Sequence, residues 1–108
     1  MINYEKIVEI IREIAPQLSL ENIIEDIEKA VESTGISIKY SDMTHLETRD
    51  VSGYVRVING IPEIIVNSND VEQRRRFTIA HELGHIFLHW RWYPGKYLSE
   101  GLVEVSYR

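Results

Sequence analysis

The feature that most constrains the fold is a predicted helix over about residues 70–89 whose two faces differ chemically. On a helical wheel, one face carries the apolar side chains Ile79, Ala80, Leu83, Ile86, Phe87 and Trp90. The opposite sector carries Thr78, His81, Glu82, His85 and His89. Polar residues at 67–70 offer N-cap candidates for the start of this helix. The helix therefore has a core face and a polar face, and its histidines share the polar one.

Two more helices are predicted in the first third of the chain. Isoleucines at helical spacing indicate the first, and Pro16 ends it because proline cannot donate the hydrogen bond that a helix interior needs. Ser19 can cap the second helix, whose apolar stripe runs from Leu20 to Val31. Gly35 stands where a C-terminal cap belongs.

The middle of the chain changes to the two-residue period of β-strands. Residues 36–40 alternate in this way. Two β-rich runs flank Asn59-Gly60, and this pair indicates a hairpin because both residues tolerate positive φ. Residues 102–107 predict a final strand. The predicted fold class is α+β, as a single domain over residues 1–108 with two N-terminal helices, a small antiparallel sheet with a hairpin at 51–67, and the long helix at about 70–89.

Composition excludes several classes of protein. The chain has no cysteine, which excludes disulfides, thiol catalysis and cysteine-ligated metal sites. Its 17 acidic and 12 basic residues give a net charge of -5, which argues against direct nucleic-acid binding. The first residues lack the basic region and cleavage site of a signal peptide, and no apolar run approaches the roughly 18 residues of a membrane span. We therefore expect a cytoplasmic protein that binds neither nucleic acid nor membrane.

His81, Glu82 and His85 form an H-E-x-x-H motif. Residues four apart share a helix face and lie about 6 Å apart along the axis, so both imidazoles can reach one ion. Zinc binds such nitrogens at about 2.0–2.1 Å and keeps a position open for water in catalytic sites. Glu82 can accept the proton of that water, whose pKa the metal lowers toward about 7. The motif predicts Zn²⁺ at His81 and His85 with Glu82 as catalytic base; the alternative is two histidines that only form hydrogen bonds at a helix surface.

A third metal ligand has no motif of its own. His89 lies about 12 Å along the helix from His81, too far for one ion, and we expect it to orient a neighbour or line the cleft. Glu100 and Glu104 are the carboxylates that follow the helix, and each can equally be a solvated acidic residue.

A basic triplet, Arg74-Arg75-Arg76, stands out in this acidic chain. It can hold a substrate carboxylate or an acidic patch of a partner. It can also simply pair with Asp70 or Glu72 at helical spacing.

The segment Arg76–His89, with the letters RFTIAHELGHIFLH, resembles the signature helix of the ImmA/IrrE family of zinc metallopeptidases. The Gly-Tyr-Val-Arg of the predicted hairpin and the Ile-Val-Asn before the helix are also similar, and the resemblance covers roughly residues 50–90. It implies a thermolysin-like active-site helix packed on a small antiparallel sheet. By position, it implies His81 and His85 as zinc ligands and Glu82 as catalytic base.

The same resemblance implies a zinc-dependent endopeptidase that hydrolyses a peptide bond in a regulatory protein, such as a helix-turn-helix repressor of a bacterial phage or mobile element. Members of the family normally supply the third ligand from a downstream helix with a motif like E-x-x-A-N-x-F-A, which this sequence lacks. The chain is then either a form truncated at its C-terminus, or one in which Glu100 or Glu104 substitutes. Two other functions stay open: a non-catalytic module that binds a partner without cutting it, and a component of a bacterial toxin module.

Overall fold

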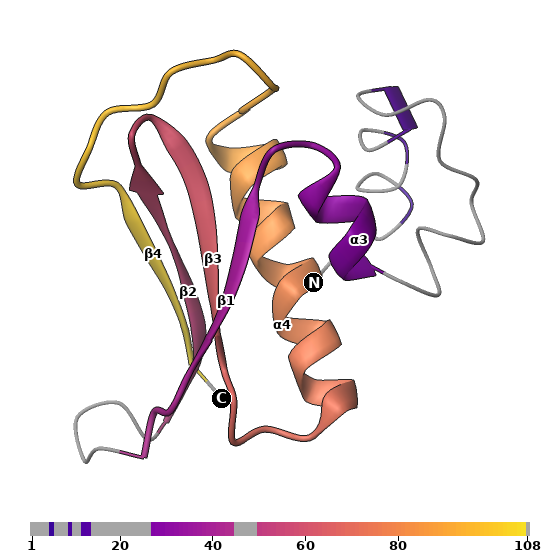
Figure 1. Ribbon diagram of the computed structural model, residues 1–108, viewed down its shortest axis with the longest axis vertical. Helices are drawn as coiled ribbons and strands as arrows, with labels where there is room; N and C mark the ends of the chain where they lie inside the picture. Colours follow the sequence, from indigo (N-terminus) through magenta and orange to yellow (C-terminus); the bar gives the residue numbers. More distant parts are fainter. Residues whose placement is uncertain (1–4, 6–8, 10–11, 14–26, 45–49, 108) are drawn as a thin grey trace.

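A computed structural model describes residues 5, 9, 12–13, 27–44 and 50–107 of the chain. It has an α+β fold in which helices lie on one side of a four-stranded sheet (Figure 1). The strands are β1 (Ser37–Ser41), β2 (Val51–Ile58), β3 (Ile61–Asn67) and β4 (Val103–Tyr107). The helices in the described ranges are α3 (Ile27–Glu32), α4 (Glu72–Gly84) and the π-helix η1 (His85–His89). None of these is long and apolar enough to cross a membrane.

The sheet is mixed, with the strand order β1-β3-β2-β4. β2 pairs antiparallel with β3 and, on its other side, with β4. Asn59 (φ 53°) and Gly60 (φ 81°) connect β2 to β3 with the positive φ angles that such a turn requires. β1 pairs parallel with β3, so the prediction of an antiparallel sheet is wrong for this edge. The reason is that β3 reverses direction after the turn and then lies between β2 and β1, and it therefore runs the same way as β1.

Most of the two predicted N-terminal helices lies outside the described residues. The described part that falls within the second one is α3. The chain leaves α3 through Gly35, whose φ of 98° suits glycine and whose N–H donates to the carbonyl of Glu32 at 3.1 Å.

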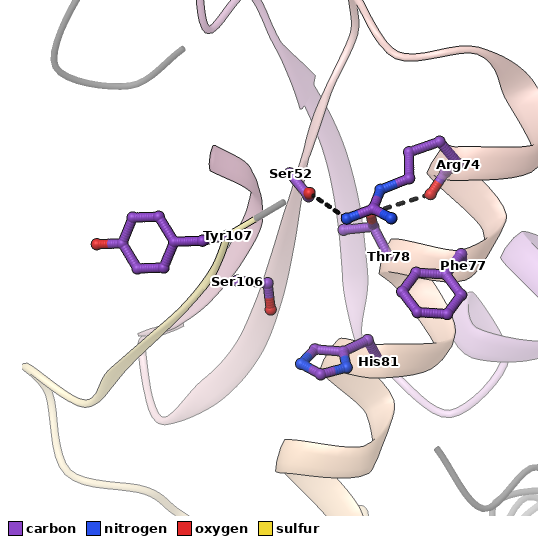
Figure 2. Close-up of a pocket in the computed structure, with 7 residues that line it drawn as sticks. All are labelled: Ser52, Arg74, Phe77, Thr78, His81, Ser106 and Tyr107. Atoms are coloured by element: carbon purple, nitrogen blue, oxygen red, sulfur yellow. Dashed lines mark hydrogen bonds between the residues drawn. The ribbon is translucent and has the colours of Figure 1, made fainter. Parts of the chain in front are cut away.

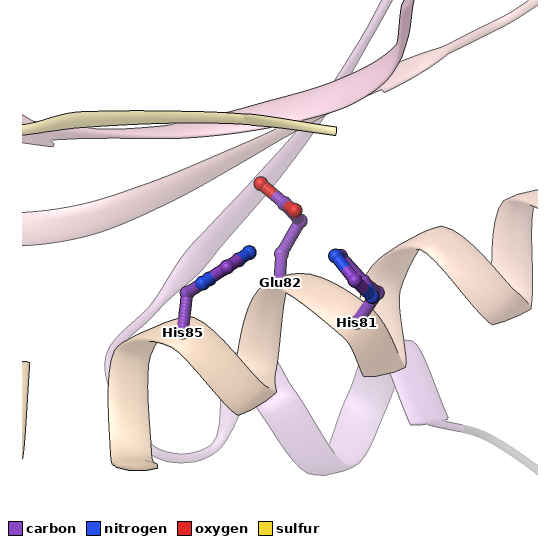
Figure 3. Close-up of side chains that lie close together, drawn as sticks. All are labelled: His81, Glu82 and His85. Atoms are coloured by element: carbon purple, nitrogen blue, oxygen red, sulfur yellow. The ribbon is translucent and has the colours of Figure 1, made fainter. Parts of the chain in front are cut away.

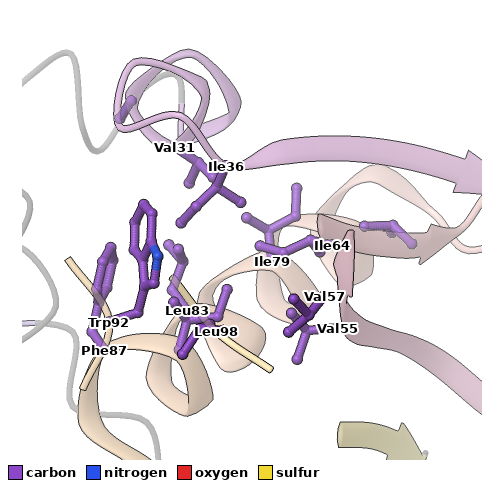
Figure 4. Packing of buried hydrophobic residues seen from close by; sticks show 13 residues of the cluster. Val31, Ile36, Val55, Val57, Ile64, Ile79, Leu83, Phe87, Trp92 and Leu98 are labelled. Carbon is purple, nitrogen blue, oxygen red and sulfur yellow. The ribbon is translucent and has the colours of Figure 1, made fainter. Parts of the chain in front are cut away.

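The hydrophobic core lies between the helices and the sheet (Figure 4). The helical side of the core includes Ile79, Leu83 and Ile86, which are all fully buried. The sheet side contributes Val55, Val57, Ile64 and Val66. Burying an aliphatic side chain of this size stabilises the fold by roughly 1.5–3 kcal/mol. The predicted apolar face of the long helix is thus the face that packs, and this packing fixes where the opposite face points.

Gly53 sets how closely α4 approaches the sheet. A Cβ atom at this position would lie 2.6 Å from the carbonyl oxygen of Ile65 and 2.7 Å from Cγ2 of Thr78. Only a glycine leaves room there for the neighbouring strand and for the helix. α4 therefore passes close to β2 one turn before the H-E-x-x-H motif.

The start of α4 differs from the prediction. The N-cap residue is Val71, which makes no capping hydrogen bond with its side chain, so none of the candidates at 67–70 occupies the N-cap position. For Asn67 the reason is visible, because its buried side chain donates to the carbonyl of Val51 at 3.1 Å and accepts from the backbone N–H of Asn69 at 3.0 Å. This amide holds the end of β3 instead of the helix.

The predicted helix continues to His89, but its last turn changes geometry. From His85 onward the backbone forms the π-helix η1, and the N–H of Trp90 donates to the carbonyl of His85 at 2.9 Å. One-turn π segments within α-helices are frequent at functional sites. Here the change of geometry begins at the second histidine of the motif.

Candidate metal centre

The structure brings His81, Glu82 and His85 together, with the carboxylate between the two imidazoles (Figure 3). One ligand atom of each side chain lies within 4.8 Å of the others. Among the described residues, this is the group of histidine and carboxylate side chains that could hold a metal ion. The grouping follows from the helix, which places residues one turn apart on the same face.

Glu82 is fully buried although it lies on the polar face of α4. β4 covers it, and the hydroxyl of Ser106 donates to Oε1 of Glu82. Oε2 is also buried and has no hydrogen-bond partner among the described residues. Burial raises the pKa of Glu82 to about 7, against the opposing effect of the Ser106 hydrogen bond and with a further rise from the charge of Glu104. Such a carboxylate can both accept and return a proton near neutral pH.

The two histidines of the motif are half-buried. Burial is the largest influence on each, and it lowers the pKa of His81 and of His85 below the usual histidine value. A lowered pKa favours the neutral imidazole, which is the form that binds a metal.

His89 contacts the second of these histidines. Its Nδ1 lies 2.9 Å from Nδ1 of His85, within hydrogen-bond distance. This contact occupies one nitrogen of His85 and leaves Nε2 for a metal, in the way that neighbouring groups commonly orient histidine ligands. The sequence prediction that His89 orients a neighbour agrees with this contact.

The two candidate third ligands are placed differently. Glu100 accepts a hydrogen bond from the backbone N–H of Gly60 at 3.2 Å, so its carboxylate serves the turn between β2 and β3. Glu104 lies on β4, two residues before Ser106. After burial, its charge adds to the rise in the pKa of Glu82, and it opposes the burial that lowers the pKa of His85. Neither carboxylate belongs to the group that lies within 4.8 Å.

Sequence reasoning missed Ser106. The prediction of a strand at 102–107 was available, but the partner of that strand and its register were not. In the structure, Ser106 lies opposite Gly53 in the pairing of β4 with β2, and this register brings its hydroxyl to Glu82. A serine in a short strand that also carries Glu104 is a weak signal, and its role follows only from the strand pairing.

The arginine triplet divides into three different roles. Arg76 pairs with Glu72 at 3.0 Å on the helix surface, as helical spacing predicted. Arg75 lies over the ring of Tyr40, with 5.6 Å between its guanidinium carbon and the ring centroid. Arg74 turns toward the sheet, where it donates to Oγ of Ser52 at 2.9 Å.

The residues present fit a metal ion. Two neutral imidazoles are nitrogen ligands that zinc prefers, and the adjacent carboxylate has a buried oxygen without a hydrogen-bond partner among the described residues. The assignment of His81 and His85 as ligands and of Glu82 as base stays a prediction, and the geometry is compatible with it.

Comparison with known protein families gives a match over the site. The sequence profile of the family described as Peptidase_M78, IrrE N-terminal-like domain, matches residues 31–92, which is more than half of the chain. The matched region runs from the end of α3 past η1 and includes all three residues of the group. No curated protein and no solved structure matches the chain significantly.

Proposed function

The chain belongs to the Peptidase_M78 family of IrrE N-terminal-like domains, and on that premise we propose that it is a zinc-dependent endopeptidase. One observation carries the proposal. A buried carboxylate with a pKa near 7 lies between two half-buried imidazoles on one helix face. This is a general base placed beside a pair of metal ligands.

In the proposed reaction His81 and His85 hold the ion. When bound, zinc supplies a Lewis acid that polarises the scissile carbonyl and makes water a stronger nucleophile. Glu82 accepts the proton of the attacking water and returns it to the leaving amine. Ser106 keeps one oxygen of Glu82 in place, so that the other oxygen receives the proton.

The proposed substrate is a regulatory protein of the helix-turn-helix repressor class, encoded on a bacterial phage or mobile element. The resemblance of residues 76–89 to the ImmA/IrrE signature helix supports this substrate class. A repressor substrate places the reaction in the cytoplasm.

The test measures metal and cleavage separately. Elemental analysis of the purified chain should find near-stoichiometric zinc, and His85→Ala should lose it. Glu82→Gln should keep the zinc but no longer shorten a helix-turn-helix repressor, as followed by mass spectrometry. Full cleavage of the repressor by Glu82→Gln would refute the role of Glu82. A repressor that is bound and stays intact with the zinc-loaded chain would instead favour the non-catalytic binding module.

A further inference from the structure

A small cavity lies between α4 and the sheet, one helical turn before the H-E-x-x-H motif (Figure 2). Its volume is about 30 Å³. Its lining includes Arg74, Phe77 and His81 from α4, Ser52 from β2, and Ser106 and Tyr107 from β4. Phe77 is exposed and its ring borders the cavity on the helix side, whereas the ring of Tyr107 points away from it (Figure 2). The proposed mechanism uses two of these residues, His81 and Ser106.

Arg74 is the charged group of this cavity. One of its terminal nitrogens donates to Oγ of Ser52 at 2.9 Å, and its guanidinium carbon lies 5.0 Å from the ring centroid of Phe77. Its Nε is buried and has no hydrogen-bond partner among the described residues. A buried donor of a charged group costs free energy when it lacks an acceptor. The guanidinium therefore has a buried donor without an acceptor among the described residues, in a side chain that lines a small cavity.

The chemistry of this donor selects its ligand. A guanidinium presents parallel N–H groups that match the two oxygens of a carboxylate. A carboxylate is small enough for the cavity, whereas an aromatic side chain is not. The whole chain has a net charge of -5, so any preference for an acidic ligand has to come from a local group such as Arg74.

The cavity is also close enough to the metal centre to contact a peptide that is bound there. The ring of Phe77 stacks on that of His81, with 6.2 Å between centroids, so Arg74, Phe77 and His81 follow one another along α4. Arg74 precedes His81 by seven residues, which is about 10 Å along a helix. An extended peptide covers about 10 Å with three residues. A group held at Arg74 would thus lie within about three residues of the bond that is cut.

We propose that Arg74 and Ser52 form a subsite for a carboxylate of the peptide substrate, near the scissile bond. This inference rests on the proposed peptidase function. The carboxylate belongs to an aspartate or glutamate side chain or to the C-terminus of the substrate, and the experiment separates these sources.

The first experiment detects the subsite without any reaction. Acetate is titrated into the protein in the presence of a chelator, and then again with zinc, while the arginine Nε–H resonances are followed by NMR. The Nε–H signal of Arg74 should shift and saturate. The Nε–H signal of Arg56 is the internal control, because it already donates to Glu63 at 3.0 Å and should not move. Absence of a saturable shift at Arg74, or an equal shift at Arg56, would overturn the proposal.

The second experiment identifies the source of the carboxylate. Three hexapeptides with acetylated N-termini are titrated into the Glu82→Gln variant, and binding is followed by the same Arg74 signal. The first has an internal glutamate and an amidated C-terminus, the second has glutamine in place of that glutamate, and the third is the glutamine peptide with a free C-terminus. One of the two acidic peptides should bind about ten- to a hundredfold more tightly than the neutral one. Equal binding of all three peptides would contradict the proposal.

Matched variants separate the subsite from general charge. Arg74→Gln should remove the preference for the acidic peptide, whereas Arg76→Gln removes the same charge from the helix surface and should keep it. Peptide binding to Arg74→Gln is monitored by calorimetry, and thermal unfolding checks its fold. Arg74→Lys is the second variant if that fold is lost, and it should weaken binding because a lysine lacks the paired donors.

The two proposals fail in different ways. Zinc-dependent cleavage with no preference between glutamate and glutamine peptides would refute the subsite and leave the peptidase function standing. Saturable acetate binding at Arg74 in a chain that cleaves no repressor would leave the carboxylate site standing and refute the peptidase function.

Discussion

The buried carboxylate of Glu82 makes a prediction about stability that needs no substrate and no metal. The pKa of Glu82 rises from 4.5 to about 7 because the folded state removes the carboxylate from water. Between these two values the unfolded chain releases the Glu82 proton and the folded chain keeps it. Stability from this group is therefore fully present below about pH 4.5 and is lost as the pH rises to about 7.

The size of the effect follows from the pKa change. One pKa unit corresponds to about 1.4 kcal/mol, so the rise to about 7 corresponds to a loss of about 3 kcal/mol across this window. Small domains have a total unfolding free energy of only about 5–15 kcal/mol. Glu82→Gln cannot ionise and should escape the loss. It carries a constant cost instead, because the new amide N–H groups of glutamine meet no acceptor where Oε2 is now unpartnered.

The assay is urea unfolding of both proteins in a chelator, from about pH 4 to about pH 8. The useful quantity is the difference in unfolding free energy between Glu82→Gln and the unchanged chain, because the other titrating groups cancel in it. This difference should move by about 3 kcal/mol in favour of the glutamine variant as the pH rises. Ser106→Ala removes a hydrogen bond that lowers the pKa of Glu82, so the transition should move to higher pH. A difference that is flat across the whole range would refute the burial argument.

Three further predictions concern the frame around the site. Gly53→Ala should destabilise the fold by about 1–3 kcal/mol in urea unfolding, because its Cβ would overlap the strand and the helix packed against it. Gly84→Ala is the control: its Cβ would meet nothing within 4 Å, so it should change the unfolding free energy by less than about 1 kcal/mol or raise it. Arg56→Gln should cost about 1 kcal/mol at neutral pH, because the Arg56 side chain is 42% exposed and solvent screens the pair. Burial raises the pKa of Glu63, but the hydrogen bonds to it, led by that from Arg56, lower the pKa by a larger amount, so the pKa is lowered overall. The ionised pair therefore stabilises the fold above the usual glutamate pKa range, and the cost of Arg56→Gln should become smaller in acid. His89→Phe should weaken zinc binding about ten- to a hundredfold by calorimetry, and unchanged affinity would mean that His89 does not orient its neighbour.

The sequence predicted the elements whose signals are local. The apolar stripe that includes Ile79 and Leu83 predicted the packed face of α4, and this face is the buried one. The positive φ angles at Asn59 and Gly60 are a property of those two residues. The parallel pairing of β1 was not predictable in this way, because alternation along residues 36–40 states which side of a strand is apolar and says nothing about its neighbour.

The candidate site also combines a feature with a local sequence signal and a feature that depends on strand pairing. The proximity of His81, Glu82 and His85 follows from helical geometry alone, and the sequence was sufficient for it. The burial of Glu82 could not be predicted in this way, because it depends on β4, a strand about twenty residues later in the chain. The polar face of a helix is normally expected to be exposed to solvent, whereas here β4 covers part of it.

β4 therefore determines more of the chemistry than its sequence suggests. Through Ser106 it fixes Glu82, and through Ser106 and Tyr107 it also walls the Arg74 cavity. The same strand thus borders two environments on one helix: a buried one in which a carboxylate keeps its proton up to about neutral pH, and a small cavity beside a guanidinium whose buried Nε has no partner among the described residues. A base needs the first environment, because water would return its pKa to the ordinary range. A charged substrate group needs the second, because in a dry apolar site it would lose its hydration without compensation.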